Sequence, residues 1–335
     1  MFVGITDAME SEGMDRRTLS MPKNHEALVK AVSEVQKNTV VVVMCGGCIT
    51  MPWIDDVRGV LYAYLGGEAV GTATLDLLFG DVNPSGKLAE TFPRRLEDNP
   101  SYLYFFGDEQ NKTEYREGVF VGYRYYDTYG KAVDYPFGYG LSYATFEIAD
   151  VTAAKTGANT ATVTATVTNT SDVDAAETVQ VYVAPGKADV ARPKHELKGF
   201  TKVFLKAGES KTVTIDLDER AFAYWSEKYN DWHVEAGEYA IEVGVSSRDI
   251  CRHRCRGPRW RRQDPAAHRM VHLRRVGGRS VRRQDCGRRG RRRRGRRADE
   301  AARQRHDAHV PQLHAHQLAA HPAGRRRQED RPVHG

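Results

Sequence analysis

The 335-residue sequence predicts an α/β domain, then an all-β sandwich, then an arginine-rich tail. Three observations lead to this division. Apolar strands alternate with amphipathic helices up to about residue 80, hydrophobic and polar residues alternate with a period of two from about residue 144, and the composition changes abruptly near residue 250. We place the domains at 1–143, 144–249 and 250–335.

The first domain begins with the pattern of a parallel sheet. Residues 2–5 are an apolar run, residues 24–37 carry apolar side chains at helical spacing, and residues 39–44 are a run of valines typical of a buried strand. A second such strand at 59–65 and a helix of small residues at 67–79 continue the alternation. The order of these elements predicts the α/β class.

Turn residues and aromatics dominate the segment from 81 to about 140. Aromatics this dense on irregular backbone pack long loops and commonly line clefts. We expect most of them to serve packing.

Short alternating stretches then follow one another and are separated by turn signals. Seven strands within about 100 residues are typical of an immunoglobulin-like or fibronectin-like sandwich. The stretches are 146–152, 160–168, 177–184, 196–205, 211–217, 220–225 and 238–245.

The loop 10–17 follows the first predicted strand and contains three acids and two arginines. Open α/β sheets bind their ligands at loops that follow the carboxyl ends of strands. This loop is therefore a candidate for acid–base chemistry, although charged loops are more often solvated surface.

Several short motifs occur in a fixed order between residues 2 and 248. They are Ser11-Glu12-Gly13-Met14-Asp15-Arg16, Met51-Pro52-Trp53, Asn83-Pro84-Ser85-Gly86-Lys87-Leu88, Thr91-Phe92-Pro93, Tyr115-Arg116-Glu117-Gly118, Gly122-Tyr123-Arg124-Tyr125-Tyr126-Asp127 and Pro136-Phe137-Gly138-Tyr139-Gly140-Leu141-Ser142-Tyr143. This series resembles the C-terminal half of glycoside hydrolase family 3, the β-glucosidase group. The resemblance implies part of an α/β sandwich domain with long aromatic loops at 1–143 and a fibronectin type III-like domain at 144–249, preceded in the family by a (β/α)8 barrel.

The resemblance also implies a retaining β-glycosidase. Family members take an aspartate nucleophile from the barrel and often a general acid/base carboxyl from a loop of the second domain, and retaining chemistry needs the two about 5–5.5 Å apart. Glu12 matches the acid/base position, Glu10 is its local rival, and we expect Asp15 and Arg16 to pair and fix the loop. The implied substrate is a β-glucoside or a related small saccharide, and we expect no cofactor and no metal.

The sequence departs from the family in one respect that matters for activity. The nucleophile motif Ser-Asp-Trp is absent, since Ser171-Asp172 is followed by Val173, and the sugar-binding residues of the barrel are absent too. We therefore expect an N-terminal barrel to be missing and the chain alone to be inactive. The alternatives are a non-catalytic carbohydrate-binding or scaffold module, or a nucleic-acid-binding protein that uses its tail.

Two further patterns have competing interpretations. Cys45 and Cys48 form a Cys-x-x-Cys that could indicate redox chemistry or half of a zinc site, but no second pair occurs before residue 250, which favours a structural role. Trp53, Trp225 and Trp232 could stack on sugar rings or pack in the core.

The charge of the chain is divided unevenly. Residues 1–250 hold 24 Lys and Arg against 37 acids, a net charge of −13, whereas residues 251–335 hold 26 Arg against 7 acids, a net charge of +19. The tail lacks Lys, Asn, Phe, Tyr and Ile together, so we expect it to be disordered. A single-base frameshift near the codon for Ile250 explains the change better than phosphate binding does, and implies that the tail's histidines and cysteines bind no metal.

The sequence contains no apolar run of the about 18 residues that a membrane helix needs, and residues 1–5 have no basic segment before them. We therefore expect a cytoplasmic protein with no membrane contact, and we do not expect nucleic-acid binding.

Overall fold

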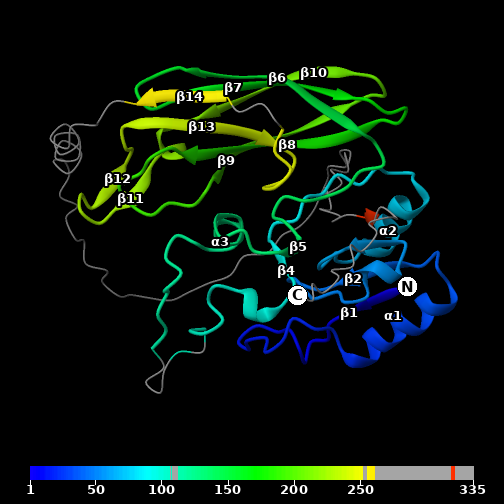
Figure 1. Ribbon diagram of the computed structural model, residues 1–335. Coiled ribbons are helices and arrows are strands. Elements are labelled where there is room, and N and C mark those ends of the chain that lie inside the picture. Colours follow the sequence, from blue (N-terminus) through cyan, green and yellow to red (C-terminus); the bar gives the residue numbers. More distant parts are fainter. Residues whose placement is uncertain (106, 108–111, 252–254, 261–317, 321–335) are drawn as a thin grey trace, which may run out of the picture. The chain divides into compact units, whose positions relative to one another are not determined.

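The computed structural model describes residues 1–105, 107, 112–251, 255–260 and 318–320 (Figure 1). Most of the predicted tail, including its arginine run at 288–297, lies outside these residues, so the frameshift and the disorder stay predictions. None of the helices in the described part of the chain combines the length and the apolar composition that a membrane crossing requires.

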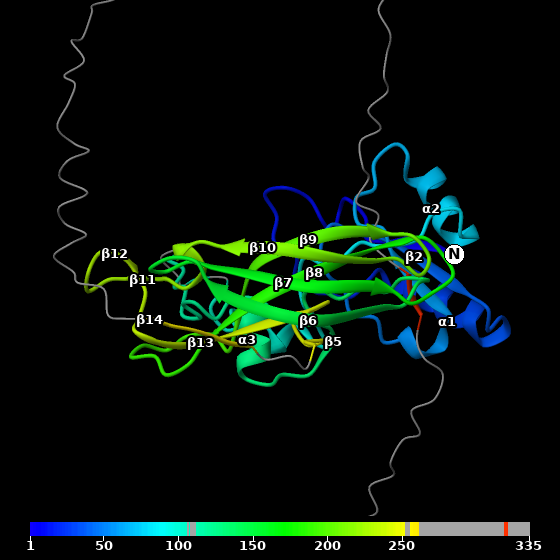
Figure 2. The ribbon, with the colours of Figure 1, turned by 90° about the horizontal axis from the view of Figure 1, so that it is seen from above.

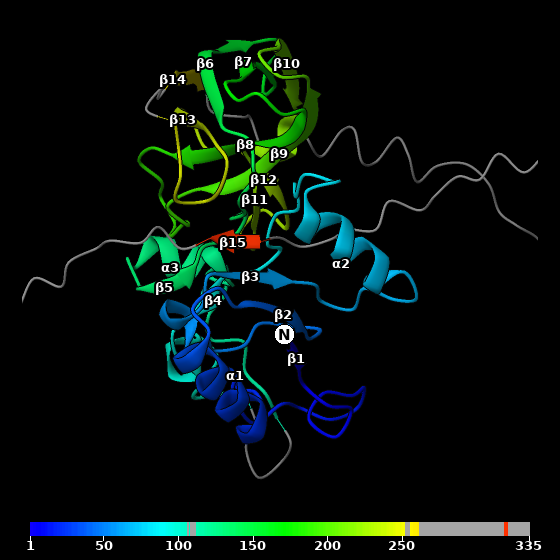
Figure 3. The same cartoon turned by 90° about the vertical axis from the view of Figure 1, so that its right-hand side faces the viewer.

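A parallel sheet forms the centre of the first domain. Strands β1 (Phe2–Gly4), β2 (Val40–Met44) and β3 (Gly59–Tyr62) pair in parallel in that order, and β15 (Leu318–Ala320) adds to β3 in the antiparallel sense. Figure 3 shows β15, in red, beside β3. The three parallel strands are those that the apolar runs predict.

Two helices cover opposite faces of this sheet because successive side chains of β2 point to opposite sides. In α1 (Lys23–Val35), Val29 packs in one core cluster with Val41 and Val43. In α2 (Val70–Phe79), Leu77 packs with Val42 in another. Both helices confirm the sequence prediction, and α2 ends at Gly80, whose φ of +82° favours glycine.

The aromatic segment after residue 80 forms short elements and loops. These are β4 (Phe92–Pro93), which pairs with β5 (Val133–Tyr135), the six-residue helix α3 (Tyr123–Thr128), and the 3-10 turns η1 (Ile54–Asp56) and η2 (Leu96–Asp98). Ring centroids lie 4.9 Å apart between Tyr62 and Phe92 and 5.0 Å apart between Tyr135 and Tyr139. These four aromatics therefore pack the loops onto the sheet. The sequence did not predict α3.

The second domain is a sandwich of two antiparallel sheets, with strand orders β10-β7-β6 and β14-β13-β8-β9 (Figure 2). The strands are β6 (Phe146–Lys155), β7 (Ala161–Asn169), β8 (Ala175–Pro185), β9 (Glu196–Leu205), β10 (Ser210–Leu217), β13 (Gly237–Gly244) and β14 (Cys255–Trp260), with a separate hairpin of β11 (Tyr224–Ser226) and β12 (Asp231–His233). In β7 every second residue is buried, which puts Val163 and Val167 in the core between the sheets.

The strand predictions hold for six of the seven stretches, and the exception is 220–225. That stretch forms the 3-10 turn η3 (Glu219–Ala221) and only the start of β11. The side chain of Asp218 accepts a hydrogen bond from the backbone N–H of Ala221 at 3.1 Å and so caps the turn. Three consecutive residues, Ala221, Phe222 and Ala223, are buried, which a surface strand could not achieve.

Two short strands occur among the described residues of the predicted tail, 250–335. Strand β14 pairs with β13 and strand β15 pairs with β3. Both add to the edge of an existing sheet. Such pairing uses backbone hydrogen bonds, which do not require the apolar composition that the segment lacks.

A buried charge cluster joins α3 to the sandwich. The imidazole of His195 lies 2.7 Å from Glu242 Oε2 through Nδ1 and 3.4 Å from Asp127 Oδ2 through Nε2. Arg248 Nε donates to the other oxygen of Asp127 at 2.6 Å. The backbone N–H of Leu197 also donates to the hydroxyl of Tyr123, at 2.7 Å.

A second group of contacts joins the loops to β8. Lys87 Nζ lies 2.7 Å from Glu177 Oε1, and both side chains are nearly buried. Gln180 Nε2 donates to the carbonyl of Gly138 at 3.0 Å, and Gly138 has a φ of +76° and no room for a Cβ beside Gln180. Glycine is therefore needed at this close approach.

Burial alone would lower the pKa of His195, but its hydrogen bonds to Asp127 and Glu242 outweigh burial and raise the pKa above its ordinary value. Burial would raise the pKa of Asp127, but hydrogen bonds from His195 and Arg248 lower it. The two neighbouring carboxylates therefore favour the charged form of the His195 imidazole.

These shifts predict a pH dependence of the free energy of unfolding. Because the folded pKa of His195 exceeds the unfolded value of about 6.5, its stabilisation is complete below that pH and is lost as the pH rises through the folded pKa. Replacing His195 by Gln should destabilise the protein by roughly 2–4 kcal/mol at pH 6 and should flatten the decline above pH 6.5. Urea unfolding of the original protein and of the His195→Gln variant between pH 6 and 9 measures both free energies of unfolding. The same slope of this free energy against pH in the two proteins would contradict the role of His195.

Candidate functional site

The candidate site lies at the carboxyl edge of the parallel sheet. Because β1, β2 and β3 are parallel, the segments that follow them emerge at the same edge. These segments are the predicted acidic loop 10–17, the glycine turn 45–48, and the residues after β3 at Ala63 and Tyr64.

Glu10 ties the acidic loop to the glycine turn. Its Oε2 accepts a hydrogen bond from the backbone N–H of Gly46 at 2.8 Å. A Cβ on Gly46 would lie 2.9 Å from Glu10 Oε1, so a side chain at this position would displace the carboxylate.

Arg16 completes this connection, and its partner is not the one that the sequence suggested. Its Nη1 donates to the carbonyl of Cys48 at 3.1 Å and lies 4.0 Å from Glu10 Oε1. The expected pair of Asp15 with Arg16 is wrong, because Arg16 turns inward to Glu10 and Cys48 while Asp15 is exposed. The loop is thus fixed from its two ends.

Glu12 lies at the tip of the loop between these fixed ends. Its side chain is exposed, and no described residue donates a hydrogen bond to its carboxylate. Ser11 and Met14 form a β-bridge around it, and Gly13 supplies the φ of +79° that the tip needs. The tip therefore presents an exposed carboxylate.

A second carboxylate, Glu90, lies near the glycine turn and was not identified from the sequence. A Cβ built on Gly47 would lie 4.0 Å from Glu90 Oε1 and 3.5 Å from Arg16 Nη1. Glu90 and Arg16 therefore both lie beside the glycine turn. Burial raises the pKa of Glu90, against the effect of its hydrogen bond with Cys48 and of the charge of Arg16. The only sequence signal was its position directly before the Thr91-Phe92-Pro93 motif.

The Cys-x-x-Cys lies in the same turn but lacks the properties of a reactive pair. Burial raises the pKa of Cys45, and burial together with the charge of Glu90 raises the pKa of Cys48 to about 12. Redox and metal-binding cysteines need an accessible thiolate. No cluster of His, Cys, Asp and Glu suited to a metal occurs within the described ranges.

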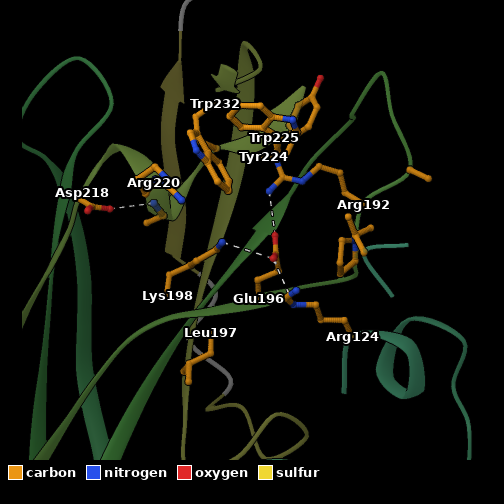
Figure 4. A pocket seen from close by; sticks show the side chains of 15 residues that line it. Arg124, Arg192, Glu196, Leu197, Lys198, Asp218, Arg220, Tyr224, Trp225 and Trp232 are labelled. Carbon is orange, nitrogen blue, oxygen red and sulfur yellow. Dashed lines mark hydrogen bonds and ion pairs between the residues drawn. The ribbon is translucent and has the colours of Figure 1, made fainter. Parts of the chain in front are cut away.

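The three tryptophans separate into two groups. Trp53 is buried in the core of the first domain. Trp225 and Trp232 are 48% and 37% exposed, and they line a cavity of about 450 Å³ in the sandwich domain (Figure 4). The sequence alone could not distinguish these two situations.

The fold is an α/β domain followed by a β sandwich, and comparison with known proteins identifies the family of both domains. Residues 1–143 match the glycosyl hydrolase family 3 C-terminal domain, and residues 177–247 match the fibronectin type III-like domain. The chain carries these C-terminal domains of glycoside hydrolase family 3.

Named relatives share this part of the chain. An exo-α-(1→6)-L-arabinopyranosidase of Bifidobacterium longum is 70% identical over 251 residues, which are 75% of this chain and 33% of the relative. The crystal structure of a family 3 β-glucosidase of Bifidobacterium adolescentis matches 77% of this chain and 38% of that one with a TM-score of 0.74. The sequence identity is 64%. The crystal structure of a Kluyveromyces marxianus β-glucosidase in complex with glucose is 41% identical, with a TM-score of 0.72 over 78% and 32%. The chain thus spans about a third of the length of the curated relatives it matches.

The contacts of Arg16 with Cys48 and Glu10 lead to a prediction on the stability of loop 10–17. Replacing Arg16 by Met removes a charge-assisted hydrogen bond from a half-buried position, which should cost about 1–2 kcal/mol in urea unfolding and speed amide exchange across residues 10–17. Replacing the exposed neighbour Arg17 by Met is the matched control and should change stability by less than about 0.5 kcal/mol. Equal effects of the two substitutions would show that Arg16 does not fix the loop.

Proposed function

We propose that this chain supplies the general acid/base half of the active site of a retaining β-glycosidase. In this proposal Glu12 is the acid/base, and a barrel domain supplies the aspartate nucleophile. The observation that supports it most is the contrast within one loop: the carboxylate of Glu10 is held by Gly46 and Arg16, whereas that of Glu12 is uncommitted at the tip.

The chemistry asks two tasks of one carboxyl. In the first step Glu12 would protonate the glycosidic oxygen as the bond to the leaving group breaks, while the nucleophile attacks the anomeric carbon from the other face. In the second step the Glu12 carboxylate would take a proton from a water molecule. That water attacks the anomeric carbon, and the bond between the sugar and the aspartate nucleophile breaks. A domain that covers the loop would remove water from the site, and desolvation favours the protonated form needed at the start.

The proposed substrate class is a β-glucoside or a related small saccharide. Its support is that the matched relatives are named as β-glucosidases and as an arabinopyranosidase, and that one of them binds glucose. The contacts of Glu10 and Arg16 hold the two ends of the loop that carries Glu12. Acid/base catalysis needs such positioning, because the proton must be transferred over hydrogen-bond distance.

The first prediction of this proposal concerns the chain alone. A single carboxyl cannot carry out a double displacement, so the purified 335-residue protein should hydrolyse aryl β-glucosides at a rate far below the ordinary enzymatic range of about 1 per second or more. Release of the nitrophenol from such substrates measures this. Turnover within the ordinary range would show that the chain holds both groups.

The second prediction assigns the role of Glu12. A chimera joins the N-terminal part of the B. adolescentis β-glucosidase to residues 1–249 of this chain, which the 64% identity favours. Glu12→Gln should lower kcat/KM for a poor leaving group such as phenol by about 10²–10⁴-fold, and by far less for 2,4-dinitrophenol, which departs without a proton.

The matched control in the same chimera is Glu10→Gln, which alters the rival carboxylate. It should affect both substrates to the same extent, because Glu10 acts on the loop and not on the leaving group. An equal loss on both substrates for Glu12→Gln would contradict the acid/base role.

A further inference from the structure

The cavity at the two exposed tryptophans is separate from the edge of the parallel sheet. It is formed by the connection from β8 into β9, the η3 turn and the β11–β12 hairpin, with Arg124 of α3 at one side (Figure 4). Its volume of about 450 Å³ lies within the range of small-molecule sites, which starts at about 300 Å³. A ligand in this cavity would therefore bind independently of Glu12.

Positive charge exceeds negative charge in the lining. The carboxylate of Glu196 lies 3.1 Å from Arg192 Nη2 and 3.5 Å from both Arg124 Nε and Lys198 Nζ. One carboxylate thus faces three cations. The second lining acid, Asp218, uses its carboxylate to cap the η3 turn.

Lys198 lies in this excess of cations with its side chain only 17% exposed. Burial lowers the pKa of Lys198, and the charges of Arg192 and Arg124 lower it further against the opposite effect of Glu196. An anion bound beside Lys198 would restore the balance of charge.

Arg220 supplies a fourth cation, and its geometry favours a planar acid group. Its guanidinium carbon lies 3.4 Å from the ring centroid of Trp232. Within the described part of the chain no carboxylate lies within ion-pair distance of Arg220. Stacking leaves the N–H edge of a guanidinium open, and that edge matches a carboxylate in a bidentate pair.

The tryptophans add an apolar surface to the same cavity. The ring centroids of Trp225 and Trp232 lie 5.7 Å apart at an angle of 72°, so the two rings form a corner. Figure 4 shows the side chain of Lys198 directed toward this corner from below. A ligand that fits must therefore present a flat apolar face as well as a negative charge.

We propose that this cavity binds a carboxylate carried on a single six-membered ring, the chemistry of a hexuronic acid. Lys198 and Arg220 bind the carboxylate, and Trp225 and Trp232 contact the ring. A phosphate or acetate ion offers the charge without the ring, and a neutral sugar offers the ring without the charge.

Isothermal titration of the full 335-residue chain at low salt tests the ligand class with four probes. D-glucuronate should bind one site with a Kd near or below about 1 mM, and D-glucose and acetate should each bind at least about tenfold more weakly. The fourth probe, 4-hydroxybenzoate, identifies the source of the ring, because tighter binding than D-glucuronate indicates an aromatic acid and weaker binding a sugar acid. Equal affinity for D-glucose and D-glucuronate, or no saturable binding of either acid, would overturn the proposal.

Variants test the site itself. Arg220→Gln and Trp225→Ala should each weaken D-glucuronate binding about tenfold or more, and Lys187→Gln, an exposed cation of the same β8–β9 connection outside the lining, should leave the affinity unchanged. Circular dichroism checks folding. If Trp225→Ala does not fold, Arg220→Gln still tests the site, because Arg220 is exposed and its replacement should not affect folding. An unchanged affinity for D-glucuronate in Arg220→Gln would refute the site.

Discussion

The parallel hydrogen bonding of β1, β2 and β3 is the constraint on which the rest of the first domain depends. Parallel pairing sends the segment after each strand to the same edge of the sheet, so loop 10–17 meets the glycine turn of β2 although the two are more than 30 residues apart in sequence. The valine run of β2 makes this possible because it can be buried on both faces, against α1 on one side and α2 on the other. Glu10 and Arg16 then convert the proximity of two loops into a fixed tip that carries Glu12.

The motifs that suggest the family serve the structure more than the chemistry. Tyr123 and Asp127 come from one motif and bond to the sandwich domain, through Leu197 and through His195 and Arg248. Gly138 comes from another motif and receives Gln180. A series of such motifs therefore marks residues that hold the two domains of the chain to each other.

The sequence predicted well those features that depend on local pattern. Apolar runs predicted β2 and β3, helical spacing predicted α1, and the period of two predicted six sandwich strands. The sequence did not predict contacts between residues that are far apart in the chain. Arg16 lies beside Glu10 because the carbonyl of Cys48 accepts a hydrogen bond from the same guanidinium. Glu90 reaches the site from a segment about 80 residues away. Exposure of Trp225 and burial of Trp53 likewise depend on tertiary contacts that composition does not contain. The role of Glu12 was inferred from family resemblance, since its residue type and spacing alone fit a solvated loop equally well.

Azide rescue tests the central claim, that Glu12 is the acid/base, most directly. In the chimera, Glu12→Ala would leave a glycosyl-enzyme that water attacks slowly, because no base removes its proton. Azide is an anion and needs no base, so it should raise the turnover of 2,4-dinitrophenyl β-glucoside about tenfold or more and yield β-glucosyl azide, with no effect on Glu10→Ala. Rescue of Glu10→Ala with none for Glu12→Ala would contradict the account and transfer the role to Glu10.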